Sequence, residues 1–310
     1  MEGKMLNNPN ITKTHFGIYG ILKQNGKILL IKKARGPYTG LYDLPGGSPE
    51  TSETKEETLK RELMEETSLK VKKYALLKEL RVIFSDFTRA SGEKGTLAHT
   101  GVLFDVADWE GDILTISDGL DSLGAQWVDI DTLNGQNATP FALIGAEKEV
   151  IHLADENDHI ISTHVRGEKP LQKGRYAMIS AVLVYNSKGE VLLHKIAPHK
   201  KWGGMWTYSA AGHVDAGEGY QEAVKRELFE ELQIKADCFE EVASLTTVEM
   251  GQKCAYHHVF KVTTDAVPIP DKNEISEIRW FKKEELKALA GMDKMAFHPK
   301  MYELIVKDKI

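Results

Sequence analysis

Short apolar runs separated by polar segments and turn formers predict strands and helices in an order that repeats along the chain. ILLI and VLLH, at 28–31 and 191–194, each follow a Gly turn, as buried strands often do. We expect helices at 54–67, 139–153, 219–232 and 295–307. We expect strands at 14–24, 27–34, 70–85, 97–107, 125–130, 176–186, 190–196, 236–249, 254–264 and 276–282. Strands interrupted by a helix and followed by a closing helix predict an α/β fold, with helices on both sides of a mixed sheet.

The two halves of the chain resemble each other, which indicates an internal duplication. RELMEETSLKV begins at Arg61 and RELFEELQIKA at Arg226. AQWVDIDTL (125–133) corresponds to IRWFKKEEL (278–286), each reading as a strand followed by a helix start. We therefore expect two domains, 1–160 and 161–310. The linker is expected within 155–175, where HIISTHV forms a strand of either domain.

Length and composition agree with two ordinary globular domains. The chain has 310 residues, about twice the usual length of a single domain. Its formal net charge of −6 argues against a basic nucleic-acid-binding surface. Cys238 and Cys254 match no disulfide or zinc spacing and are expected to be free thiols. Without a long apolar run we expect no membrane partner and a cytoplasmic protein.

Three glutamates on the first predicted helix suggest a metal site. Glu62, Glu65 and Glu66 are spaced i, i+3, i+4, so we expect them on one face, with Leu59 and Leu63 on another. Clustered carboxylates repel unless solvent counterions or a divalent cation offset their charge. Oxygen ligands without Cys or His select Mg²⁺, Mn²⁺ or Ca²⁺. Glu227, Glu230 and Glu231 repeat the arrangement on the other predicted helix.

Residues around the carboxylates repeat as well. Arg61 and Arg226 follow Glu53 and Glu218 by eight positions, which predicts an ion pair that holds the helix against the preceding loop. The glycines before them, Gly46, Gly47 and Gly212, suit a tight turn whose carbonyl can reach a metal. Each feature alone is common on a solvated surface or in a turn. Their joint spacing, found twice, favours a functional site.

This joint spacing resembles the Nudix box, G-x5-E-x7-R-E-U-x-E-E-x-G-U, in which U is a bulky aliphatic residue. The first copy reads Gly47, Glu53, Arg61, Glu62, Leu63, Glu65, Glu66 and Leu69. The second reads Gly212, Glu218, Arg226, Glu227, Leu228, Glu230, Glu231 and Ile234. Both copies depart at the late glycine of the box, which is Ser68 or Gln233 here. That residue is expected where the helix ends in a left-handed conformation.

The resemblance implies two tandem Nudix-type α/β/α sandwich domains with mixed sheets. It also implies hydrolysis of a nucleoside diphosphate linked to another moiety, with Mg²⁺ as cofactor and Mn²⁺ as a substitute. By the resemblance, the catalytic candidates are Glu65, Glu66, Glu230 and Glu231, and the choice of general base stays open. The implied metal ligands are Gly47, Glu53, Glu62, Glu65, Glu66, Gly212, Glu218, Glu227, Glu230 and Glu231. Arg61 and Arg226 would support the helices.

Outside the box the copies differ. The first, with LPGG, resembles MutT-type hydrolases, and the second resembles the hydrolase relatives of isopentenyl diphosphate isomerase. An isomerase would use a Cys before the box, where Thr207, Tyr208 and Ser209 stand. A nucleotide-binding sensor, or one catalytic and one regulatory domain, stays as an alternative. The domains are expected to form an internal pseudo-dimer, or the chain a homodimer.

Other charged residues near the boxes receive a structural interpretation. Lys32, Lys33 and Arg35 follow the first buried strand, and we interpret them as solvent-facing charges rather than phosphate ligands. His194, His199 and His213 flank the second box without a required role.

Overall fold

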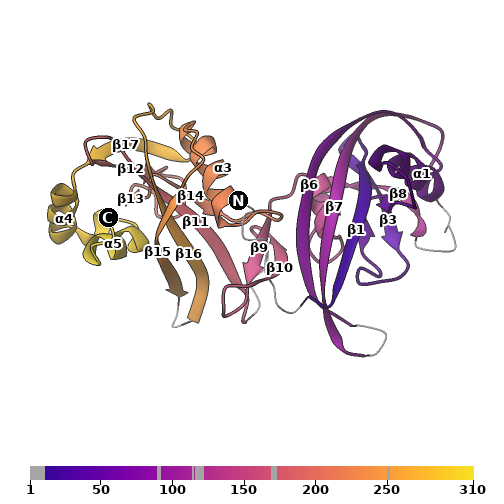
Figure 1. Cartoon of the computed structure of the whole chain (residues 1–310), viewed down its shortest axis with the longest axis horizontal. Helices are drawn as coiled ribbons and strands as arrows, with labels where there is room; N and C mark the ends of the chain where they lie inside the picture. The colour runs from indigo at the N-terminus through magenta and orange to yellow at the C-terminus, as the bar shows by residue number, and fades with distance from the viewer. Residues whose placement is uncertain (1–10, 89–91, 114, 116–121, 169–172, 250–251) are drawn as a thin grey trace. The chain divides into compact units, whose positions relative to one another are not determined.

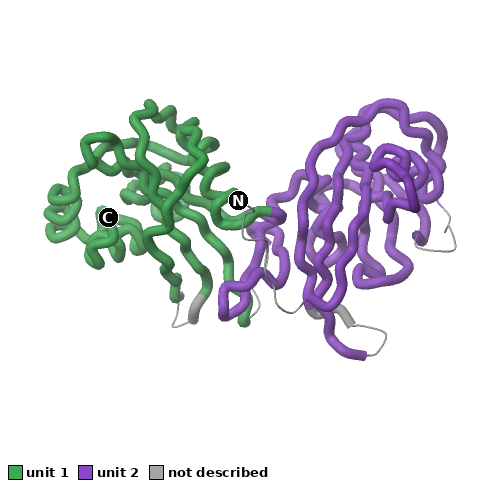
Figure 2. The backbone as a smooth tube through the Cα atoms, in the orientation of Figure 1, with its two compact units in different colours: residues 1–5, 173–214, 218–310 green, residues 6–172, 215–217 purple. Residues whose placement is uncertain are grey.

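The chain forms two compact units, which are coloured separately in Figure 2. A computed structural model describes residues 11–310 except 89–91, 114, 116–121, 169–172 and 250–251. Unit 2 holds the described part of residues 6–172, together with residues 215–217. Unit 1 holds residues 173–214 and the described part of 218–310.

Unit 2 carries the first copy of the repeat (Figure 1). Its strands are β1 (Lys13–Ile21), β2 (Lys23–Gln24), β3 (Lys27–Lys33), β4 (Tyr42–Asp43), β5 (Gly46–Gly47), β6 (Lys70–Thr88), β7 (Lys94–Glu110), β8 (Ser122–Asp129), β9 (Val150–Ala154) and β10 (Ile160–Val165). Its helices are α1 (Lys55–Thr67), the 3-10 helix η1 (Ile130–Thr132) and α2 (Pro140–Gly145). Strands β1 and β7 pair in parallel, whereas β6 with β7 and β3 with β8 pair antiparallel, so the strands are mixed in direction.

Side chains of β3 alternate between two cores, which explains its continuous apolar run. Leu29 and Ile31 pack in the same cluster as Leu59 and Leu63 of α1. The intervening Ile28 and Leu30 join a second cluster that contains Phe141, Ala142 and Leu143 of α2. Successive residues of a strand point to opposite faces, so helices cover both sides of β3. This is the layered α/β/α arrangement expected from the sequence.

Unit 1 repeats this arrangement with longer closing helices (Figure 1). Its strands are β11 (Tyr176–Tyr185), β12 (Val191–Ile196), β13 (Trp206–Thr207), β14 (Ala210–His213), β15 (Glu240–Glu249), β16 (Gln252–Thr263) and β17 (Ile275–Phe281). Its helices are α3 (Tyr220–Leu232), α4 (Lys283–Met292), η2 (Lys294–Ala296) and α5 (Pro299–Val306). Strands β11 and β16 are parallel, as β1 and β7 are. Leu192 packs with α3, whereas Val191 and Leu193 pack with α4 and α5.

The helix predicted at 139–153 is the main error of the secondary-structure prediction. α2 starts at Pro140, capped by the Thr139 side chain, and ends at Gly145. Glu147 then adopts a left-handed backbone with φ of 60°. The chain continues as the fully buried strand β9, which pairs with β10. The apolar run was too short for its periodicity to separate a helix from a buried strand.

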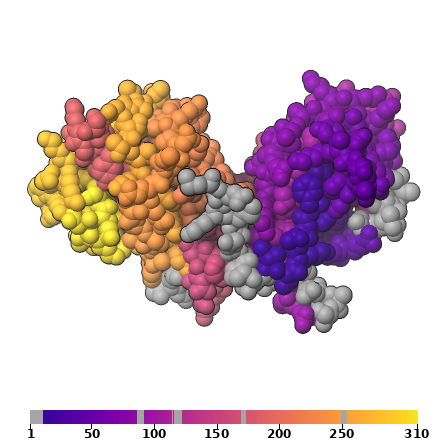
Figure 3. Space-filling model, viewed as in Figure 1, coloured from indigo at the N-terminus to yellow at the C-terminus, as the bar shows by residue number. Residues whose placement is uncertain are grey.

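Neither Cys238 nor Cys254 forms a disulfide with a residue that the structure describes. Within the described ranges, no helix is long and apolar enough to cross a membrane. Figure 3 shows that side chains fill the spaces between the elements of each unit on the face in view.

Candidate active site

Helices α1 and α3 present the repeated glutamates, and each has a defined start and end. Thr54 caps α1 by accepting a hydrogen bond from the Glu57 amide, and the Glu57 carboxylate accepts one from the Thr54 amide. α1 ends at Ser68 with φ of 61°, and α3 ends at Gln233 with φ of 57°. The left-handed helix ends predicted at these two positions are confirmed. Each costs free energy because a side chain is disfavoured there.

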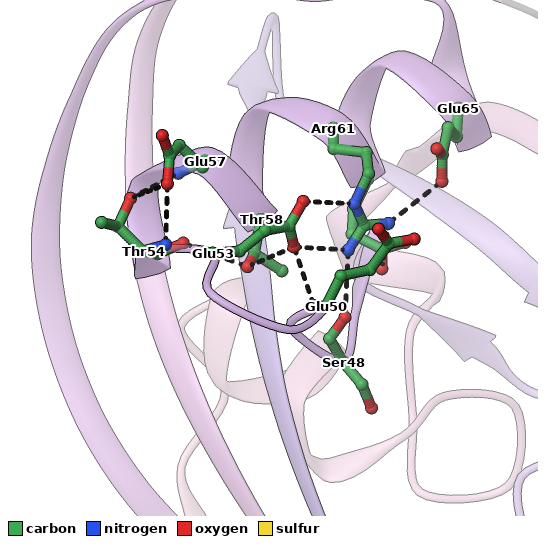
Figure 4. Close-up of polar contacts among 9 residues, drawn as sticks. Ser48, Glu50, Glu53, Thr54, Glu57, Thr58, Arg61 and Glu65 are labelled. Carbon is green, nitrogen blue, oxygen red and sulfur yellow. Dashed lines mark hydrogen bonds and ion pairs between the residues drawn. The ribbon is translucent and has the colours of Figure 1, made fainter.

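An arginine in the middle of α1 holds the preceding loop (Figure 4). Arg61 donates to both oxygens of Glu53, with Nε–Oε1 and Nη2–Oε2 distances of 2.7 and 2.9 Å. Its Nη2 also donates to the Ser48 carbonyl at 3.0 Å. Its Nη1 binds Oε1 of Glu62 at 2.9 Å and Oε2 of Glu65 at 3.1 Å. The predicted Glu–Arg contact is therefore a two-pronged ion pair that also gathers two further carboxylates.

The second unit contains the same arrangement. Arg226 donates to both oxygens of Glu218, at 2.9 and 3.0 Å. Its Nη1 reaches Glu227 at 2.7 Å and Glu230 at 3.1 Å, and its Nη2 reaches the His213 carbonyl at 3.0 Å. The two clamps match contact for contact, although they rest on independent sets of side chains.

Glycine at the start of each box leaves room for a carboxylate. A Cβ atom built on Gly47 would lie 2.4 Å from Oε1 of Glu62. A Cβ atom on Gly212 would lie 1.9 Å from Oε1 of Glu227. Any larger residue would displace the carboxylate, so each glycine allows the carboxylate to stay beside its arginine.

The last glutamate of each trio is buried rather than solvated. Glu66 is 5% exposed, and its Oε2 accepts a hydrogen bond from the Gly46 amide at 2.8 Å. Burial raises the pKa of Glu66 to about 8. Glu231 is 7% exposed, and burial also raises its pKa well above the ordinary value. Its buried Oε2 lacks a hydrogen-bond partner among the described residues, with Nδ1 of His194 3.9 Å away.

The three carboxylates of each helix lie on neighbouring positions of its surface, as the i, i+3, i+4 spacing predicts, but they differ in exposure. In α1 the exposed fractions of the Glu62 and Glu65 side chains are 14% and 57%, and both bind Arg61. Glu66 lies instead in the buried stripe with Leu59 and Leu63, because positions i, i+4 and i+7 fall on one side of a helix.

The carboxyl groups of the first site have different pKa values because their surroundings differ. Hydrogen bonds from Arg61 lower the pKa of Glu53 to about 2, so this carboxylate stays charged. Burial raises the pKa of Glu62, and its ion pair with Arg61 opposes that shift. The first site thus combines a carboxylate that stays charged with a buried one whose protonation depends on its partner.

The chemistry of these donors fits a hard divalent cation. Carboxylate oxygens are the ligands that Mg²⁺ and Mn²⁺ take, and the unpartnered Oε2 of Glu231 is a buried acceptor suited to a cation. In the described part of the chain, no three acidic, His or Cys side chains already converge on one point. Glu62 and Glu65 are turned toward Arg61, so holding a metal together would require them to reorient.

Some residues near the first site were missed or interpreted differently from the sequence. Asp43 is buried in β4 and accepts hydrogen bonds from Thr139 and Leu44, which no local pattern indicated. Lys33 is half-buried and lines a cavity with the exposed Arg35. Lys32 is exposed as interpreted, with its Nζ 5.8 Å from the centre of the Tyr42 ring. The signal that was available for Lys33 is its position at the end of a buried strand.

Comparison with known proteins shows similarity to one family over both units. A family model described as NUDIX domain matches residues 12–148 and 175–304. An uncharacterised Nudix hydrolase of Listeria monocytogenes is 34% identical over 151 residues, covering 44% of this chain and 82% of the relative. Isopentenyl-diphosphate Delta-isomerase 2 of Photorhabdus laumondii is 29% identical over 149 residues, covering 46% of this chain and 81% of that protein. A crystal structure of the Deinococcus radiodurans protein DR0079 aligns with a TM-score of 0.45 and 27% identity, covering 51% of this chain and 98% of that one.

Proposed function

The chain belongs to the Nudix family and is a Nudix-type pyrophosphohydrolase, and we propose that both of its domains carry a Mg²⁺-dependent active site. Each site would cleave the diphosphate of a nucleoside diphosphate linked to another moiety. The observation that carries this proposal is the duplicated clamp, in which Arg61 and Arg226 each gather three carboxylates.

The proposed ligand sets combine the clamp carboxylates with the box glycines. In the first domain they are Gly47, Glu53, Glu62, Glu65 and Glu66. In the second they are Gly212, Glu218, Glu227, Glu230 and Glu231. Bound Mg²⁺, or Mn²⁺ in its place, would neutralise the diphosphate and lower the pKa of the attacking water.

The protein's own groups then have defined tasks in the proposed reaction. The water oxygen forms a bond to one phosphorus, and the bond from that phosphorus to the bridging oxygen breaks. A carboxylate takes the proton that the water loses, and Glu65 and Glu66, or Glu230 and Glu231, are the candidates. Arg61 and Arg226 keep the helix and the preceding loop in register, so the carboxylates stay oriented.

Separate inactivation of the two sites tests this proposal. Product release with Mg²⁺ is measured over nucleoside diphosphate derivatives and prenyl diphosphates, for wild type, Glu66→Gln, Glu231→Gln and the double variant. We expect each single variant to lose roughly 10²- to 10⁴-fold turnover on the substrates of its own site. Glu56→Gln, which changes an exposed carboxylate on α1, is the matched control.

Unchanged turnover of every active substrate in both single variants would disprove the site assignment. Tight nucleotide binding in calorimetry, without product from any substrate, would instead support a sensor. Loss of all activity in one single variant, with none in the other, would support one catalytic and one regulatory domain.

We further propose that the partner is a small-molecule diphosphate rather than a nucleic acid or a membrane, and that the protein acts in the cytoplasm. Light scattering would test the expected homodimer, and a monomeric mass would leave the internal pseudo-dimer.

A further inference from the structure

Part of the loop inside the second box is grouped with the first domain. Figure 2 shows residues 215–217 in the colour of unit 2, although Val214 and Glu218 on either side belong to unit 1. The loop begins after Gly212 and ends at Glu218, which are both proposed metal ligands. The course of the loop therefore affects where these two ligands lie.

Backbone contacts join the segment 215–217 to strand β9, and all of them lie inside unit 2. The first residue of the segment forms an isolated antiparallel β-bridge with this strand. The Ala216 amide donates to the Val150 carbonyl at 2.7 Å, and the Gly217 amide donates to Nε2 of His152 at 2.8 Å. Burial lowers the pKa of His152 to about 4, so its neutral ring has a nitrogen that can accept this hydrogen bond.

The same segment is part of the hydrophobic core of the first domain. Ala216 is buried in the cluster that contains Leu80 of β6. The backbone of Gly217 lies against that leucine, because a Cβ atom built on Gly217 would be 2.7 Å from Cβ of Leu80. Strand β9 pairs with β10, and β10 is tied to β6 by a hydrogen bond from Ser85 Oγ to the Ile161 carbonyl. The support of the loop therefore continues into the main sheet of the first domain.

The equivalent loop of the first box is exposed to solvent. Residues 48–52 are all exposed, whereas every residue of 213–217 is buried or half-buried. The first loop is closed by its own glutamate, since Oε2 of Glu53 accepts a hydrogen bond from the Glu50 amide at 2.9 Å. The two boxes therefore share their spacing and their arginine clamp, but β9 covers the loop of the second box and solvent covers that of the first.

We propose that β9 positions the second active site: His152 and the Val150 carbonyl hold the box loop, and through it Gly212 and Glu218, where they can bind metal. The second site then depends on the folded core of the first domain, whereas the first site holds its own loop. This inference rests on the proposed function for the role of the two ligands. His152 is a positioning residue, because it acts on the ligands through the loop backbone, as outer-shell partners do in metal sites.

Residue-resolved hydrogen exchange on the full chain tests the anchoring of the loop without reference to any substrate. After correction for intrinsic rates, the amides of Ala216 and Gly217 should exchange on the order of 100-fold more slowly than those of Thr51 and Ser52, because β9 accepts their hydrogen bonds. His152→Leu should speed exchange of the Gly217 amide roughly tenfold or more, and His152→Gln should speed it less. Equal exchange in the two loops of wild type would overturn the proposal.

The Mg²⁺ dependence of the second site tests whether the anchored loop positions its ligands. In the Glu66→Gln background, Leu80→Ala removes the side chain that packs against Gly217 and should raise the Mg²⁺ concentration for half-maximal activity roughly tenfold. Leu80→Met fills a similar volume and should restore the wild-type value. Val71→Ala is the matched control and should leave the value unchanged, because Val71 is a buried residue of β6 outside the cluster that holds Ala216. Circular dichroism checks that each variant is folded in the assay.

An unchanged Mg²⁺ requirement in Leu80→Ala, or an equal rise in Val71→Ala, would overturn the positioning role while leaving the hydrolase assignment intact. A Glu66→Gln protein that hydrolyses no substrate would instead refute the proposed function of the second site. Mn²⁺ binding, measured by electron paramagnetic resonance, then decides the positioning role. Adding Leu80→Ala should weaken binding of one Mn²⁺ roughly tenfold, and unchanged binding would reject the proposal.

Discussion

Glu66 and Glu231 hold equivalent positions in the two helices, and their surroundings correspond. The Gly46 amide donates to Glu66, and a backbone hydrogen bond at Ala211, the equivalent residue before the second box glycine, acts on Glu231. The buried Oε2 of Glu231 has no hydrogen-bond partner in the described part of the chain. Burial raises the pKa of both carboxyl groups. A buried carboxyl group that is kept protonated without a cation can become charged when a cation binds, which couples metal binding to proton release.

The metal-free protein should become less stable as pH rises, because folded Glu66 must then release its proton or stay protonated against the pH. Its pKa is raised from 4.5 to about 8, so the folded state holds a proton that the unfolded state has released across this window. The stability contribution is complete below pH 4.5 and declines by up to about 1.4 kcal/mol per pH unit toward pH 8. With EDTA present, urea unfolding should show that the free energy of unfolding of Glu66→Gln rises relative to that of wild type between pH 5 and 8. A constant difference across that range would contradict the shift, and Glu56→Gln is the control.

Substitution of the box glycines should separate activity from stability. In Gly212→Ala the new Cβ would force the Glu227 carboxylate away from Arg226, and in Gly47→Ala it would displace Glu62 from Arg61. We expect activity at the altered site to fall on the order of 100-fold, with an unfolding free energy within about 1 kcal/mol of wild type because the displaced carboxylates are flexible. Gly291→Ala, where a Cβ meets nothing within 4 Å, should lower neither the activity nor the unfolding free energy. Full activity in both variants would show that these close approaches are unimportant.

At the scale of the element, the ends of α1 and α3 are strained where the box usually has glycine. Ser68 and Gln233 both adopt left-handed backbone conformations at the C-cap. Each amide still donates back to the helix, Ser68 to the Met64 carbonyl and Gln233 to that of Phe229. Both helices therefore end with the usual left-handed residue and its backbone hydrogen bond, although that residue carries a side chain.

Ser68→Gly should stabilise the first domain. Glycine removes a left-handed cost of about 1–2 kcal/mol but adds roughly 0.5–1 kcal/mol of chain entropy to the unfolded state. A net gain of about 0.5–1 kcal/mol should appear in the unfolding free energy. Ser68→Ala keeps the strain and serves as the comparison. A Ser68→Gly protein no more stable than Ser68→Ala would show that the strain is negligible.

At the scale of the whole molecule, the duplication gives two boxes, but the two compact units do not correspond to two continuous halves of the chain. Residues 215–217, directly before Glu218, belong to unit 2 (Figure 2). There the Gly217 amide donates to Nε2 of His152 at 2.8 Å, and the Ala216 amide donates to the Val150 carbonyl at 2.7 Å. Strand β9 thus anchors the segment that leads into the second box.

His152→Leu should impair the second site although His152 lies in the first half of the sequence. The variant leaves the half-buried Gly217 amide without its acceptor, at a cost of about 1 kcal/mol. In the Glu66→Gln background, kcat/KM of the remaining site should fall, with His152→Gln retaining more activity because its amide oxygen can accept. His159→Leu, which alters a more exposed histidine of the same unit, is the control. Equal activity of His152→Leu and its background would show that the anchor does not matter.

Local spacing was sufficient to predict much of this protein. The extents of α1 and α3, the Glu53–Arg61 and Glu218–Arg226 pairs and the left-handed helix ends all depend on residues within one or two helical turns. Such contacts follow from helix geometry, which the sequence spells out directly. The duplication added independent support, because each copy confirmed the other.

Features that join distant segments were decided only in the tertiary structure. The sequence did not show that Glu66 is buried while Glu65 is exposed, that β9 replaces the second half of a predicted helix, or that Lys33 lines a cavity. Each depends on which strand or helix packs against the residue, and that environment is assembled from positions tens of residues away. The sequence by itself therefore determined the family, the repeated box and its acidic chemistry, whereas packing of β1, β3 and β7 decided where charge is buried and where a cationic cavity forms.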